Sequence, residues 1–140
     1  MVDVDVLQRK TLAIRHYRER LRAYGALTAG QLVADETLWN SVTMDLLQVI
    51  QPCIDLALHT VVDDVLGTPA EAAGAFALLG SAGVIPRALA IRMAAAVGLR
   101  NLIVHRYGDL DAELIVSVVA HELEHVDEFV RLIEVWARSA

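Results

Sequence analysis

The sequence has little cysteine, proline or aromatic residue. Cys53 is the single cysteine among 140 residues, so the chain can form neither an internal disulfide nor a cysteine-based zinc site. It lies in an apolar stretch, and we expect it in the core. Three prolines, 5% aromatic residues and abundant Ala, Leu and Val favour packed helices over short strands. The length predicts one domain, residues 1–140.

A long uninterrupted apolar run is also missing. The longest stretch without a charged residue, from Ala72 to Pro86, is too short to cross about 30 Å of hydrocarbon and is interrupted by glycines. Asp3 and Asp5 stand where a secretory signal would carry positive charge. We therefore expect a cytoplasmic protein with no membrane-spanning segment. The hydrophobic content of 56% is high for a monomer, which predicts a homodimer that buries the excess apolar surface.

Positive charge is scarce, and the net charge of −6 opposes non-specific binding to nucleic acid. The charge is unevenly distributed along the chain. Residues 1–22 carry six bases and three acids, whereas residues 109–140 carry eight acids and two bases. Two interpretations remain open at this point. The basic segment forms a surface that attracts RNA, or a basic first helix lies against the acidic last helix.

Hydrophobic periodicity predicts an all-α fold, an antiparallel bundle of about five helices. The predicted helices span about residues 3–24, 35–66, 68–79, 86–106 and 111–136. The third is predicted from a capping signal: Thr68 at the N-cap, Pro69 at the first helical position and Glu71 two residues later. The fourth predicted helix is rich in small residues, Gly and Ala, so a neighbouring helix can approach it closely.

The end of the fourth predicted helix carries the residues with the clearest chemistry, in the pattern R-x4-H-x-Y. Asn101 and His105 are four apart and share one helix face, and Arg100 and Tyr107 share another. Side chains five apart diverge by about 140°, so an arginine and a histidine at this spacing would meet at a phosphate rather than at each other. RNA supplies its own 2′-hydroxyl nucleophile, so cleavage needs a cation and a proton carrier, without metal or cofactor. Helix capping or a salt bridge would explain the same pair, and the spacing alone does not decide between them.

The segment from Arg100 to Tyr107 resembles the R-x4-6-H motif of HEPN ribonucleases, in the R-x4-H-x-Y form of HepT-like toxins. The likeness extends beyond the motif. Residues 54–59 resemble the I-D-x-A-x-H segment of that family, and residues 75–86 resemble its middle section. The resemblance covers roughly residues 45–115, in the expected order.

This resemblance implies a HEPN-type bundle that dimerises so that two R-x4-H motifs face one cleft. The implied activity is that of a metal-independent endoribonuclease toxin that uses no cofactor and cleaves RNA with Arg100 and His105, while Asn101 orients the site. The implied partner is an MNT-type nucleotidyltransferase antitoxin that transfers AMP onto Tyr107. The nucleotide would fill the cleft and place phosphate charge beside Arg100. The alternative is a non-enzymatic protein that serves only as partner and substrate of the nucleotidyltransferase.

Asp55 and His59 lie four apart on the second predicted helix, a spacing at which a carboxylate can orient an imidazole. They form either a supporting polar layer of the cleft or a buried hydrogen bond between helices, and the second interpretation is slightly favoured.

The last predicted helix contains His121, Glu122 and His125, which match the H-E-x-x-H pattern of zinc metalloproteases. The extended form of that pattern requires glycine at 128 and histidine at 131, where this chain has Glu128 and Arg131. We therefore expect no metal site, and a zinc hydrolase is the least favoured function.

Overall fold

The computed structural model describes residues 2–139, and within that range every regular element is helical. The elements are α1 (Val4–Arg22), α2 (Ala29–Ala34), α3 (Glu36–Asp63), α4 (Ala72–Ser81), α5 (Arg87–His105), the 3-10 turn η1 (Tyr107–Asp109), α6 (Ala112–Ser117), the π-helical turn η2 (Val118–Glu122) and α7 (Leu123–Arg138). The all-α prediction is confirmed. The last predicted helix corresponds to the continuous run of α6, η2 and α7.

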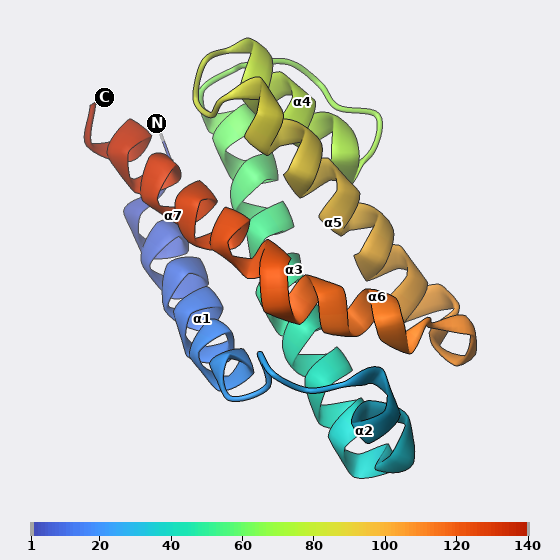
Figure 1. Cartoon of the computed structure of the whole chain (residues 1–140). Coiled ribbons are helices and arrows are strands. Elements are labelled where there is room, and N and C mark those ends of the chain that lie inside the picture. Colours follow the sequence, from blue (N-terminus) through green and yellow to red (C-terminus); the bar gives the residue numbers. More distant parts are fainter. Residues whose placement is uncertain (1, 140) are drawn as a thin grey trace.

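The long helix α3 lies at the centre of the bundle (Figure 1). Helix α1 packs along one side of it, with α7 beside α1, and the pair α4 and α5 packs on another side. The first turn of α1 is capped by Asp3, whose carboxylate accepts from the backbone N–H groups of Asp5 and Val6 at 2.8 and 3.2 Å. The central position of α3 places it in contact with both the first helix and the motif helix α5.

Helix α2 is not among the predicted helices, because six residues are too few to show a periodicity. Its N-terminus nevertheless carries a capping box. The Thr28 hydroxyl accepts from the backbone N–H of Gln31 at 3.1 Å, and the Gln31 side chain accepts from the backbone N–H of Thr28 at 2.9 Å. This T-x-x-Q pattern was the signal that could have revealed α2.

The predicted capping box at Thr68 and Glu71 is wrong. Helix α4 begins only at Ala72, and Glu71 is itself the N-cap, with extended backbone and no side-chain cap hydrogen bond. The preceding segment instead packs over the first turn of α4. A Cβ built on Gly74 would lie 3.4 Å from Cβ of Pro69, so packing of this connection replaces the predicted helical turn.

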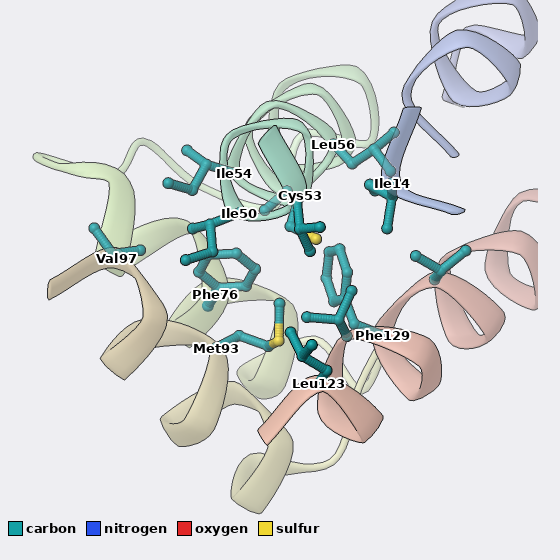
Figure 2. Packing of buried hydrophobic residues seen from close by; sticks show 14 of the residues in the cluster. Ile14, Ile50, Cys53, Ile54, Leu56, Phe76, Met93, Val97, Leu123 and Phe129 are labelled. Atoms are coloured by element: carbon teal, nitrogen blue, oxygen red, sulfur yellow. The ribbon is translucent and has the colours of Figure 1, made fainter. Parts of the chain in front are cut away.

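The core is built around α3 and is closed by side chains from α4, α5 and α7 (Figure 2). The rings of Phe76 and Phe129 meet edge to face, with centroids 5.4 Å apart. Cys53 is fully buried beside them, as predicted. Burial in these apolar surroundings raises the pKa of the Cys53 thiol, so the thiol stays protonated and unreactive.

The basic first helix lies against the acidic last helix. Arg15 pairs with Glu134, and Arg18 pairs with Asp127 at 3.1 Å, in both cases from α1 to α7. This bears out the second interpretation of the uneven charge, because carboxylates of α7 neutralise these basic groups.

Two helices are long and apolar enough to cross a membrane by length and composition alone. They are α3, whose apolar window is 61% buried inside the protein, and α5, whose window is 33% buried. Both helices contain charged residues, so neither forms an uninterrupted uncharged run in the sequence. Core helices of soluble proteins pass the same test, so the finding is weak evidence for a membrane. The low burial of α5 leaves much of the motif helix uncovered.

Candidate active site

The R-x4-H-x-Y motif lies at the C-terminal end of α5, where the helix gives way to η1. His105 is the last helical residue, and the backbone N–H of the next residue, Arg106, still bonds to the carbonyl of Leu102 at 2.8 Å. Tyr107 begins the 3-10 turn. The motif therefore combines a rigid helical part with a turn that redirects the tyrosine.

Arg100 and Tyr107 both face the central helix α3, as their spacing predicts. Arg100 Nη1 donates to Gln51 Oε1 at 2.9 Å. The Tyr107 hydroxyl donates to Asn40 Oδ1 at 2.5 Å and lies 2.9 Å from Thr43 Oγ1. Going forward along α5 therefore means going backward along α3, so the two helices are antiparallel at the site.

Asn101 and His105 are exposed and share a side of α5 that points away from α3. Neither side chain has a hydrogen bond to another residue within 2–139. In one chain, Arg100 and Tyr107 thus both face α3, at contact points eight residues apart on that helix, whereas Asn101 and His105 face outward. This is the angular divergence that the spacing predicts.

The guanidinium of Arg100 carries a charge that no carboxylate among residues 2–139 neutralises. Within residues 2–139, four arginines lack a carboxylate oxygen within 4.0 Å: Arg9, Arg87, Arg100 and Arg138. The other three are exposed, whereas Arg100 is partly buried. Its Nε is buried and has no hydrogen-bond partner in the described chain. A partly desolvated cation with free donors is suited to binding an anion.

Behind Arg100 a chain of polar side chains crosses α3 to reach α1. Gln51 Nε2 donates to Asp55 Oδ1 at 3.0 Å, and Lys10 Nζ donates to Asp55 Oδ2 at 2.8 Å. We call this chain of Lys10, Asp55, Gln51 and Arg100 the α1–α3–α5 polar chain. Gln51 was not among the predicted site residues, although it lies one helical turn before Asp55.

The structure separates Asp55 from His59. Asp55 is partly buried and belongs to the polar chain, where its bond to Lys10 joins two helices. His59 is exposed and makes no hydrogen bond to another described residue. The expected contact between helices thus exists for Asp55, and its partner is a lysine of α1.

Tyr107 borders an open pocket of about 520 Å³. Trp39 and Leu110 also line it, and the rings of Trp39 and Tyr107 have centroids 6.3 Å apart. Asn40 and Thr43, which contact the tyrosine hydroxyl, were not among the predicted site residues. No sequence pattern marks them, because they meet Tyr107 only through the packing of α3 on α5.

The H-E-x-x-H segment spans the π-helical turn and the start of α7. His121 is exposed, while Glu122 pairs with His125 at 3.2 Å and with Arg92 at 3.7 Å. Among residues 2–139, no three His, Cys, Asp or Glu side chains are placed to hold a metal ion together. Glu122 and His125 thus contact one another and Arg92 at the surface.

The family described as ribonuclease HepT-like matches residues 14–133, which include the whole motif and its partners on α3, Asn40, Thr43 and Gln51. The chain belongs to the ribonuclease HepT-like family. The resemblance recognised in the sequence is thereby confirmed.

Individual HepT-like relatives support the assignment. The mRNA nuclease HepT of Shewanella oneidensis is 33% identical over 131 residues, 93% of this chain and 97% of the relative. A solved structure of the tri-AMPylated HEPN toxin of Shewanella oneidensis in complex with its MNT antitoxin is 31% identical, with a TM-score of 0.86 and coverage of 95% of this chain and 99% of that one.

A cytosolic protein of unknown function from Bacillus subtilis shares the HepT-like architecture with a TM-score of 0.84, covering 99% of this chain and 92% of that one, but is only 13% identical. At that identity the likeness shows the fold alone. The confirmed HEPN-type bundle therefore rests on the closer relatives.

Proposed function

We propose that this protein is the toxin of a toxin-antitoxin pair and acts as a metal-independent endoribonuclease. Arg100 and His105 are its catalytic residues, and Asn101 orients the site. The observation that carries the proposal is the partly buried Arg100 guanidinium, which has no carboxylate partner within the described chain. The Shewanella oneidensis relative, named an mRNA nuclease, supplies the substrate class.

The chemistry requires no group beyond these side chains and the RNA itself. The 2′-oxygen attacks the adjacent phosphorus while its proton passes to a base, and the bond from phosphorus to the 5′-oxygen breaks as that oxygen takes up a proton. His105, exposed at the helix end, is the proton carrier. Arg100 stabilises the charge that develops on the phosphoryl oxygens. The products are a 2′,3′-cyclic phosphate and a 5′-hydroxyl.

Removal of metal ions tests this proposal. Purified protein should cleave RNA equally well in EDTA and after addition of zinc or magnesium, because the reaction uses protein side chains and the 2′-hydroxyl. Cleavage is measured as the loss of full-length RNA in a gel assay. Abolition of cleavage by EDTA, with recovery on addition of one metal, would contradict the metal-independent mechanism.

We propose that two copies of the chain complete the cleft. An apolar groove of about 370 Å³ runs beside the motif on α5, and its lining includes Gly98, Leu99 and Leu102. Ile91 and Val104 add exposed apolar surface on the same helix, 70% and 51% exposed. A second copy would cover this surface and bring the outward-facing His105 of each copy toward one cleft.

Gly98 offers a direct test of the dimer. Nothing lies within 4 Å of a Cβ built at this position, so an arginine fits within one chain while obstructing a partner. Gly98→Arg should be monomeric by light scattering, lack RNA cleavage, and remain folded, since arginine is a better helix former than glycine by up to about 1 kcal/mol. Ala77→Arg, on the exposed face of α4, is the control with the same added charge. A fully dimeric Gly98→Arg protein would sink this assignment of the interface.

We propose further that an MNT-type nucleotidyltransferase antitoxin neutralises the protein by attaching AMP to Tyr107. The tyrosine is 38% exposed and its hydroxyl is held by α3. The contact points of Tyr107 and Arg100 on α3, Thr43 and Gln51, lie about 12 Å apart along the helix axis at about 1.5 Å per residue. The first phosphate would therefore sit beside Thr43, and a longer nucleotide chain would be needed to reach Arg100 of the same copy. The relative in complex with its antitoxin is tri-AMPylated.

A further inference from the structure

We propose that Gln51 is a positioning residue for the cleavage reaction: it holds the Arg100 guanidinium in place without neutralising its charge. This inference rests on the proposed role of Arg100 in RNA cleavage. Gln51 is partly buried on α3 and lies between the cation of α5 and the carboxylate of Asp55.

The chemistry of its neighbours fixes the orientation of the Gln51 amide. A guanidinium can only donate hydrogen bonds, and an ionised carboxylate can only accept them. Gln51 must therefore present its oxygen to Arg100 and its NH2 group to Asp55, which is the arrangement observed. Lys10 in turn holds the second oxygen of Asp55 at 2.8 Å. Each side chain in the polar chain thus restricts the next.

Gln51 is the one hydrogen-bond partner of the Arg100 side chain within residues 2–139. Nε of the same guanidinium is buried and has no partner there. Loss of this bond would leave the long arginine side chain without a polar anchor and free to change rotamer. A displacement of about 1 Å at a reacting centre can lower a rate about 100-fold.

The neutral amide also keeps a negative charge away from Arg100. Asp55 lies one helical turn beyond the amide and is already paired with Lys10. A carboxylate at position 51 would instead form an ion pair with Arg100 and compete with the phosphate of the substrate. Anchoring through an amide therefore gives a fixed guanidinium that retains its attraction for RNA.

The test compares two variants of the full-length protein in single-turnover RNA cleavage. Gln51→Glu should cleave about 10- to 100-fold more slowly than wild type at pH 7, because the new carboxylate neutralises Arg100. Gln51→Met should also be slower, because methionine has a similar shape but lacks both the oxygen and the NH2 of the amide. Gln48→Glu is the matched control, because it introduces the same charge on the same helix. Gln48 is exposed, and its side chain contacts Met44.

The pH profile separates positioning from a general loss of structure. When the introduced carboxyl of Gln51→Glu takes up a proton, its carbonyl can accept from Arg100 and its hydroxyl can donate to Asp55, as the amide does. The deficit of Gln51→Glu relative to wild type should therefore shrink as the pH falls from 7 and the new carboxyl takes up its proton, at a pH that Arg100 lowers and Asp55 raises. Gln51→Met has no titrating group, so its deficit should stay constant over the same range.

The outcomes distinguish this inference from the proposed function. Wild-type rates for both Gln51 variants, in a protein whose cleavage is lost in His105→Ala, overturn the positioning role and leave the nuclease mechanism standing. An equal deficit in Gln51→Glu and Gln48→Glu also overturns it. If Gln51→Glu fails to fold, Gln51→Met decides by its rate alone. Undiminished cleavage by His105→Ala would overturn the proposed mechanism itself.

Discussion

His105→Ala should cleave RNA about 10²- to 10⁴-fold more slowly than wild type, because a positioned proton carrier contributes a factor of that size. The fold should be unaffected, since His105 is exposed at the end of α5 and makes no side-chain hydrogen bond to another residue within 2–139. The rate is measured under single-turnover conditions in EDTA.

The matched control is His121→Ala, which removes another exposed histidine, from the H-E-x-x-H segment. The proposed mechanism predicts a rate close to that of wild type for this variant. If His121→Ala lost activity while His105→Ala kept it, the assignment of the catalytic histidine would be wrong, and the zinc hydrolase would have to be reconsidered.

Tyr107→Phe should accept no AMP from the cognate nucleotidyltransferase and ATP, while its RNA cleavage persists. The substitution removes the hydroxyl that is the proposed nucleophile and retains the ring beside Trp39. Loss of the hydrogen bonds of the tyrosine hydroxyl should cost little stability. Thr43 Oγ1 also donates to the Trp39 carbonyl at 2.8 Å, and Asn40 is exposed to water. Intact-mass measurement should show AMP additions on wild type and none on the variant.

Tyr24→Phe serves as the control, because Tyr24 lies in the turn that follows α1 and is not part of the R-x4-H-x-Y motif. It should be modified as wild type is. Continued AMP addition to Tyr107→Phe would place the modification on another side chain. AMP addition to Tyr107 in a wild-type protein that never cleaves RNA would favour the non-enzymatic alternative.

Much of the fold could be predicted from the sequence because its signals are local. The periodicity that predicts α1 depends on residues within a few turns of one another. The same holds for the motif, since spacing on one helix decides that Arg100 and Tyr107 share a face while His105 turns away. These predictions needed no knowledge of how the helices pack.

The rest depends on contacts between distant segments. Thr28 and Thr68 both begin a capping pattern, but only Thr28 caps a helix. At Thr68 packing prevails, because Pro69 covers the start of α4 near Gly74. The partners of the motif depend on the antiparallel register of α3 against α5. Shifting that register by one turn would give Arg100 a different neighbour from Gln51, and no local pattern fixes it.

The most direct test of Arg100 and His105 acting on a phosphodiester is the chemistry of the RNA ends that the protein produces in EDTA. The account predicts 2′,3′-cyclic phosphate and 5′-hydroxyl ends, since the 2′-oxygen of the RNA is the nucleophile. Fragments with 3′-hydroxyl and 5′-phosphate ends would mean that water attacked the phosphorus, and they would contradict the mechanism.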